Sequence, residues 1–281
     1  MLTGASVFSF FGFVVSQLFL GIPLLTDPNL LDNARDPELL PALRTMQVLQ
    51  AFGLLIVPSV LYLWIADSWD GIKQLFQSPV RQSVMISIVF FMVALPFVNF
   101  LAEWNMSWEI PTFVGEWIGG KEDQIGTLTE LFLDMPHAGL LVFNLIMIAL
   151  LPAVGEELIF RGIMQRGLQE RINPHVAIWL IAALFSAIHM QFLGFMPRLL
   201  MGVAMGYLLL WSGNLWYPII AHFTNNALAV IFAYGIQHNA IDAGLEQSGT
   251  DNATVAAFSL IFCLMLLYLF KQHQEAGSTK G

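Results

Sequence analysis

Apolar residues occur along this chain in long runs separated by polar segments, not in the short alternating pattern of a soluble protein. A helix needs about 20 mostly apolar residues to cross the hydrocarbon core of a bilayer. We expect such helices at residues 6–25, 45–66, 83–102, 138–163, 175–192, 198–211, 215–234 and 255–270. The pattern predicts an all-α integral membrane protein, a bundle of about eight transmembrane helices in a single membrane domain over residues 1–281.

The longest polar interruption covers residues 103–137. Its acidic residues far outnumber its one lysine, Lys121. They are Glu103, Glu109, Glu116, Glu122, Asp123, Glu130 and Asp134. Three tryptophans suit a membrane–water interface, and apolar residues recur at helical spacing from Ile125 to Phe132. We expect an extramembrane loop containing an interfacial helix that acts as a lid or contacts substrate. A solvated acidic loop is the alternative.

Composition supports a membrane protein. Hydrophobic residues make up 57% of the chain and charged residues only 11%, whereas about 25% of an ordinary soluble domain is charged. The net charge of −9 and the lack of a lysine or arginine cluster argue against a nucleic-acid partner. Cys263 is the only cysteine, so it forms no intrachain disulfide and no cysteine metal cage. We therefore expect the protein to be surrounded by the lipid bilayer.

Lysine and arginine are unevenly distributed between the two sets of loops. The first run is longer than a signal-peptide core and ends at Thr26-Asp27-Pro28, so we read it as a retained span. One side then holds Lys73, Arg81, Arg161, Arg166, Arg171, Lys271 and Lys280, and the other holds Arg35, Arg44, Lys121 and Arg198. Cytoplasmic loops are the more basic ones. We expect a multi-pass protein of the plasma membrane with both termini cytoplasmic and Glu156 near the cytoplasmic end of residues 138–163.

Ionisable residues interrupt three of these runs. A charge inside the bilayer costs about 2.5–3.5 kcal/mol even on lenient scales, so it indicates function by default. Glu157 and Arg161 are four residues apart in the order that favours a helical ion pair. Glu156 points about 100° away from Glu157 and is free to take a proton from water. The alternative is a structural ion pair at a helix end.

Two later runs carry histidines at helical spacing. Phe185 and His189 share one helix face, and His222 and Asn226 share another. His222 and Asn226 can donate hydrogen bonds to the oxyanion of a tetrahedral intermediate. Asn225 is one position off this face and is the weaker candidate. Each pair alone is more often a hydrogen bond between helices.

The three patterns, Glu-Glu-xxx-Arg, Phe-xxx-His and His-xxx-Asn, resemble in this order the type II CAAX prenyl protease and bacteriocin-processing family, also called CPBP or Abi. The match covers about residues 156–226, within an expected catalytic core at 130–235. The resemblance implies an intramembrane glutamate-type endopeptidase acting on a membrane-associated or lipidated peptide or protein. By the same carry-over Glu156 and His189 activate water, and His222 and Asn226 stabilise the oxyanion. Glu157, Arg161 and Phe185 support the site.

The residues alone leave other functions open. A glutamate and two histidines could bind Zn²⁺, although no His-Glu-xx-His motif is present and asparagine is a poor zinc ligand. We expect no cofactor, with a zinc-dependent membrane protease as the less favoured alternative. A non-catalytic bacteriocin-immunity or scaffold protein is a second alternative. A transporter is a third, but the chain shows no repeated pair of broken helices.

Overall fold

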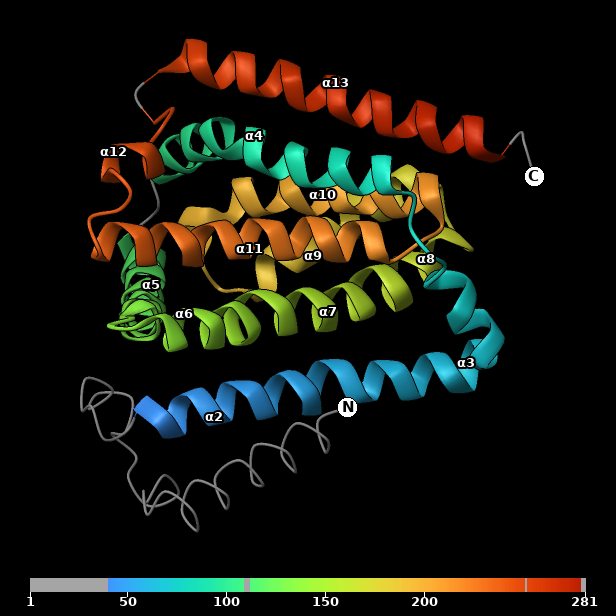
Figure 1. Cartoon of the computed structure of the whole chain (residues 1–281), viewed down its shortest axis with the longest axis horizontal. Coiled ribbons are helices and arrows are strands. Elements are labelled where there is room, and N and C mark those ends of the chain that lie inside the picture. Colours follow the sequence, from blue (N-terminus) through green and yellow to red (C-terminus); the bar gives the residue numbers. More distant parts are fainter. Residues whose placement is uncertain (1–39, 109–111, 251, 279–281) are drawn as a thin grey trace.

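The computed structural model describes residues 40–108, 112–250 and 252–278, and every regular element in these ranges is a helix (Figure 1). The first long helix joins α2 (Leu40–Gln50), the π-helical segment η1 (Ala51–Ile56) and α3 (Val57–Leu75). A second one joins α6 (Ala138–Asn144), η2 (Leu145–Leu150), α7 (Leu151–Glu157), η3 (Leu158–Gln165) and α8 (Arg166–Gln169). The others are α4 (Arg81–Met106), α5 (Thr112–Leu133), α9 (Pro174–Ile188), the 3₁₀ turn η4 (Phe192–Gly194), α10 (Phe195–Ser212), α11 (Trp216–Gln237), α12 (Ala243–Glu246) and α13 (Ala253–Ser278).

The fold class predicted from the sequence is confirmed, but the count of eight spans is wrong. Six helices of the described ranges are long and apolar enough to cross a bilayer: Leu40–Leu75, Arg81–Met106, Ala138–Gln169, Phe192–Ser212, Trp216–Gln237 and Ala253–Ala276. The span expected at residues 6–25 lies outside the described residues. The run at 175–192 contains only the 15-residue helix α9. It is cut short because Met190 adopts a left-handed backbone with a φ of 55°, which ends the helix after Ile188.

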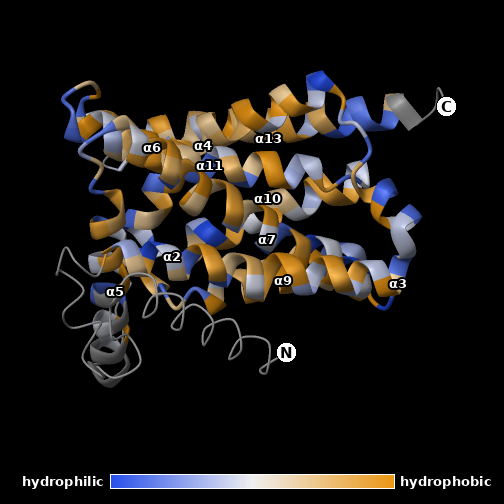
Figure 2. Ribbon diagram, turned by 60° about the horizontal axis from the view of Figure 1, so that its bottom comes forward, coloured by the Kyte–Doolittle hydropathy of each residue, from blue (hydrophilic) through white to orange (hydrophobic). Residues whose placement is uncertain are grey.

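The long helices are largely hydrophobic along their lengths (Figure 2), and many of their large side chains lie on the outside of the bundle. Large hydrophobic side chains are exposed on the outer helices, for example Ile65 on α3, Leu180 on α9 and Ile261 on α13. On α9 the exposed residues recur at helical spacing and form one face: Val176, Trp179, Leu180, Leu184 and Ile188. Contiguous apolar surface on this scale indicates contact with lipid. The protein is therefore an integral, multi-pass membrane protein.

Two prolines explain two of the π-helical segments. Pro58 follows η1 and Pro152 follows η2. A proline lacks the N–H that would bond the carbonyl four residues earlier, and its ring crowds that carbonyl. Wider π turns often occur where a helix is distorted in this way, and frequently at functional sites. Pro152 therefore leaves the carbonyl of Ile148 without its usual helical partner.

The bundle has two distinct ends (Figure 1). The α3–α4 and α10–α11 connections meet at one end, where Leu215 N donates to Leu75 O and Asn214 Nδ2 donates to Gln77 O. Helix α5 lies across the opposite end, next to the turn between α9 and α10. There Gln237 Nε2 donates to Asp134 Oδ1 and fixes the end of α11 to the segment after α5. The candidate site lies between these ends, on the side that α5 covers.

Candidate active site

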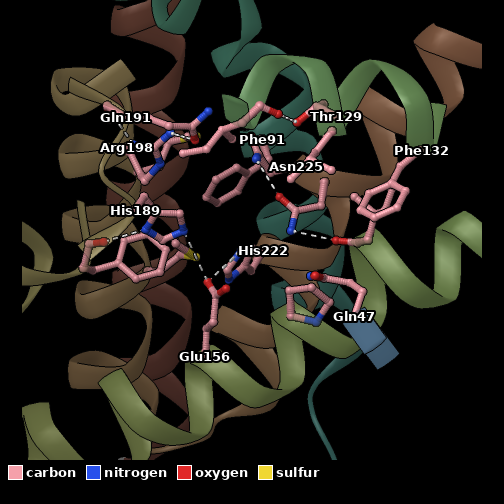
Figure 3. Close-up of a pocket in the computed structure, with 18 residues that line it drawn as sticks. Gln47, Phe91, Thr129, Phe132, Glu156, His189, Gln191, Arg198, His222 and Asn225 are labelled. Atoms are coloured by element: carbon pink, nitrogen blue, oxygen red, sulfur yellow. Dashed lines mark hydrogen bonds and ion pairs between the residues drawn. The ribbon is translucent and has the colours of Figure 1, made fainter. Parts of the chain in front are cut away.

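Glu156 lies on α7, near the middle of a 32-residue helix and not at its end. The expectation that it sits near the cytoplasmic end of its span is corrected, because the helix continues through η3 and α8 to Gln169. Its Oε2 atom lies 3.9 Å from His189 Nε2 and 3.8 Å from His222 Nε2 (Figure 3). This oxygen is buried, and no hydrogen-bond partner lies within reach among the described residues. A carboxylate oxygen thus faces two imidazoles at slightly more than hydrogen-bond distance.

His189 follows the last residue of α9, and one backbone contact sets its orientation. Its Nδ1 atom lies 2.7 Å from the carbonyl oxygen of Phe185, one turn earlier. A carbonyl can only accept a hydrogen bond, so Nδ1 carries the proton. In the neutral ring the Nε2 atom then carries a lone pair, which is directed toward Glu156. His189 can accept a proton from a molecule held at that point.

His222 on α11 is oriented by Glu157. Its Nδ1 atom lies 2.8 Å from Glu157 Oε1, and an ionised carboxylate only accepts, so here too Nδ1 carries the proton. Its Nε2 atom faces Glu156. A carboxylate behind an imidazole stabilises the doubly protonated ring, as it does in the serine-protease triad. His222 can donate a hydrogen bond into the cavity only in that charged form.

Arg161 neutralises Glu157 in the interior. Both side chains are almost completely buried, and Arg161 Nη1 donates to Glu157 Oε1 at 2.9 Å. Arg161 Nη2 also donates to the carbonyl of Gly202 on α10, and Gln165 Nε2 does the same to Gly206. The small-residue face of α10 gives room for these side chains. A methyl group at Gly206 would come within 2.9 Å of Gln165 Oε1 and 2.8 Å of Ile178 Cγ2.

Phe185 joins these groups through its ring. The guanidinium carbon of Arg161 lies 4.9 Å from the ring centroid, which is a cation–π distance. The ring centroids of His189 and His222 lie 4.8 Å and 5.9 Å away, both edge to face. The side chain is buried. Phe185 therefore separates the ion pair from the cavity while packing against both histidines.

A cavity of about 500 Å³ opens beside these groups. Helix α5 covers part of it with Ile125, Leu128, Thr129 and Phe132, and α2 contributes Gln47. Glu156, His189 and His222 line it, as do Asn225 and Asn226. The volume lies in the range of small-ligand and peptide-binding pockets. The structure thus gathers Glu156 and the two histidines around one space, with Glu157 and Arg161 behind them.

Asn226 is held in the cavity wall by two contacts. Its Oδ1 atom accepts from Asn225 Nδ2 at 3.1 Å, and its Nδ2 atom donates to Ile148 O at 3.4 Å. That carbonyl is the one that Pro152 leaves without a helical donor. Pro152 therefore leaves this carbonyl available as the acceptor for Asn226. Nothing in the sequence patterns had linked this proline to the site.

Arg198 is a second residue that the sequence patterns missed. It was counted among loop residues, yet it lies on the first turns of α10 and lines the cavity. The sharp turn at Gly194 and Pro197, shortly after His189, was the available signal that the chain folds back here. Figure 3 shows Arg198, His189 and Glu156 following one another along one side of the cavity.

A zinc site would need three or more protein ligands directed at one point. Within the described part of the chain, no group of three or more histidine, cysteine, aspartate or glutamate side chains has the arrangement of a metal site. The zinc-dependent alternative therefore rests on residue types alone. The arrangement suits proton transfer, since a carboxylate and two oriented imidazoles face a common point.

Residues 138–228 match the family described as type II CAAX prenyl endopeptidase Rce1-like. The uncharacterized protein YpbD of Bacillus subtilis (strain 168) is 33% identical over 89 residues, which cover 30% of this chain and 43% of that protein. The match thus spans less than half the length of this curated relative. No solved structure matches the chain significantly. The family resemblance drawn from the three sequence motifs is confirmed, and residues 138–228 contain all of the predicted site residues.

Proposed function

We propose that this membrane protein is an intramembrane endopeptidase in which Glu156 activates water, as the similarity of residues 138–228 to type II CAAX prenyl endopeptidases supports. One observation carries the proposal. The buried Oε2 atom of Glu156 has no protein partner among the described residues and faces the Nε2 atoms of two histidines. A group left unpaired in this way inside a membrane protein is costly, and it fits a site built to hold a reacting molecule.

The first step is attack of water on a peptide carbonyl. A water molecule beside the line from Glu156 Oε2 to His189 Nε2 can reach both acceptors, since the atoms are 3.9 Å apart. Glu156 takes a proton from it, and the water oxygen bonds to the carbonyl carbon. The carbonyl electrons move onto the oxygen and form a tetrahedral oxyanion. A positioned base of this kind contributes about 10²–10⁴-fold to the rate.

The second step is collapse of the intermediate. Protonated His222 donates from Nε2 to the oxyanion, and Asn226 donates from its amide, which lowers the energy of the developing charge. The carbon–nitrogen bond breaks, and the leaving nitrogen takes the proton that Glu156 had accepted. Glu157 holds the Nδ1 proton of His222 throughout, with Arg161 fixing Glu157. Catalysis needs no covalent enzyme intermediate.

The substrate class follows from the position of the cavity. It lies among membrane helices and is partly walled by apolar side chains, so a membrane-associated or lipidated peptide suits it.

The plasma membrane is the proposed location, with both termini in the cytoplasm. Among the described residues near the two ends of the bundle, Lys73, Arg81, Arg166, Arg171 and Lys271 lie at the α3–α4 end, and Arg44, Lys121 and Arg198 lie at the other. The α5 side of the cavity then faces away from the cytoplasm.

The proposal is tested with purified protein reconstituted in vesicles and a mixture of apolar peptides analysed by mass spectrometry. We expect cleavage by the natural sequence and none by Glu156→Ala or His189→Ala, with both variants folded by circular dichroism. Cleavage retained in either variant would contradict the assigned roles. Loss of activity with a chelator, followed by recovery with Zn²⁺, would instead support the metal-dependent alternative.

A further inference from the structure

Arg198 is a cation in the cavity wall without an ion-pair partner. In the described ranges no carboxylate makes a direct ion pair with its guanidinium, although Glu122 and Glu156 are near enough to attract it electrostatically, and Glu156 is the other formally charged group of the lining. Nη1 donates to Gln191 O at 3.2 Å, and Nη2 donates to Gln191 Oε1 at 3.0 Å. A guanidinium has five N–H donors. These two bonds therefore leave donors for a bound molecule.

The turn between α9 and α10 fixes where this guanidinium points. Gln191 holds it from one side, and the backbone at Gly194 lies against it, because a methyl group there would come within 3.2 Å of Nη2. The same turn is tied to α5, since Leu193 N donates to Glu122 Oε1 at 3.0 Å. His189 begins this turn. Arg198 is thus held at a set position relative to the proposed reacting groups.

A partly buried guanidinium that makes no direct ion pair is costly, and a carboxylate bound against its free N–H groups would lower that cost. Its planar fork matches the two oxygens of a carboxylate, which it can bind with two parallel hydrogen bonds. The rest of the cavity wall near α5 is apolar, with Ile125, Leu128 and Phe132. A carboxylate on an otherwise apolar peptide fits both parts of this lining.

We propose that Arg198 is a substrate-binding residue that pairs with a carboxylate of the peptide and so sets the distance from that carboxylate to the bond that is cut. This inference rests on the proposed peptidase function and names the residue that recognises the substrate. The carboxylate is either the C-terminus of the substrate or the side chain of an aspartate or glutamate. Both present the same pair of oxygens, and matched peptides separate them.

The test measures binding to the Glu156→Gln variant, so that its outcome does not depend on cleavage. The probes are fluorescent peptides of alanine, valine and leucine in three forms: a free C-terminal carboxylate, a C-terminal amide, and an amide with one internal glutamate. Arg198→Gln and Arg198→Lys are added to the same Glu156→Gln protein. Arg166→Gln is the matched control, because Arg166 pairs with Asp67 outside the cavity.

We expect a carboxylate-bearing peptide to bind about 10- to 100-fold more tightly than the plain amide, the range typical of a charged hydrogen bond. Arg198→Gln should remove this preference, Arg198→Lys should keep part of it, and Arg166→Gln should leave it intact. The form that shows the preference identifies the C-terminus or the side chain.

Equal binding of all three peptides before any change at Arg198 would overturn the proposal. So would an equal loss for all three peptides in Arg198→Gln, which would mean that Arg198 only supports the turn. The proposed peptidase function fails separately, if the natural sequence shows no cleavage that depends on Glu156. A preference for carboxylate-bearing peptides without any cleavage would support the proposed binding role of Arg198 and would contradict the proposed peptidase function.

Discussion

Glu156 and Glu157 are adjacent in the chain but lie in opposite environments. Glu157 is completely buried and its Oε1 atom accepts hydrogen bonds from Arg161 and from His222. Each carboxylate has one buried oxygen without a hydrogen-bond partner in the described residues, but only Glu156 lines the cavity. Neighbouring residues on a helix point about 100° apart, which separates a structural carboxylate from one available for chemistry. The two positions should therefore respond differently to the same substitution.

Glu157→Gln should destabilise the protein strongly. The amide keeps an acceptor but leaves Arg161 as an uncompensated buried cation, and breaking a buried ion pair costs about 3–5 kcal/mol. Glu156→Gln is the matched control, because its Oε2 atom makes no hydrogen bond within the described residues, so the change should leave stability nearly unchanged. Thermal unfolding in one detergent measures both. Equal melting temperatures for the two variants would refute the division of roles.

At the scale of the helices, the site depends on close contact between the helix Ala138–Gln169 and α10. Arg161 and Gln165 are one turn apart on the former, and they donate to carbonyls one turn apart on α10. The absence of side chains at Gly202 and Gly206 makes this approach feasible. The sequence shows only two small residues four positions apart on one helix face, a spacing that lets helices approach each other. It could not show that polar side chains use the space.

Gly206→Ala should weaken this contact. The new methyl group meets Ile178 and Gln165 at distances that require one of them to move, and overpacking of a core costs about 1–3 kcal/mol. Gly167→Ala is the control, since a methyl group there meets nothing within 4 Å. We expect a lower melting temperature for the first variant and no decrease for the second. A Gly206→Ala protein as stable as the natural sequence would mean that the helices are not packed this closely.

For the whole molecule, the distribution of charge predicts orientation. The α3–α4 end carries most of the lysine and arginine residues, so it should face the cytoplasm, with α5 on the opposite side. In a Cys263→Ser background, an impermeant thiol reagent applied to intact cells should label Gln247→Cys near α12 and spare Ser78→Cys between α3 and α4. Both positions are exposed. The reverse labelling pattern would invert the topology.

The sequence predicted the fold class and named most residues of the candidate site, for different physical reasons. Long apolar runs indicate membrane helices directly. Ionisable groups are rare in such runs, which identified Glu156, His189 and His222 as candidates. The short helix α9 was misjudged, because a left-handed residue at Met190 leaves no trace in hydropathy. Arg198 and Pro152 were missed because their roles depend on which helices are neighbours in space.

The central claim is that Glu156 takes a proton from the attacking water. Its most direct test is the single-turnover rate of peptide cleavage by the natural sequence and by Glu156→Gln in the same vesicles, with matched melting temperatures. Glutamine keeps the shape and the hydrogen-bonding capacity of the side chain but cannot accept that proton. We predict that the rate falls by about 10²–10⁴-fold. A Glu156→Gln rate within about tenfold of the natural one would contradict the account, since a general base contributes more than that.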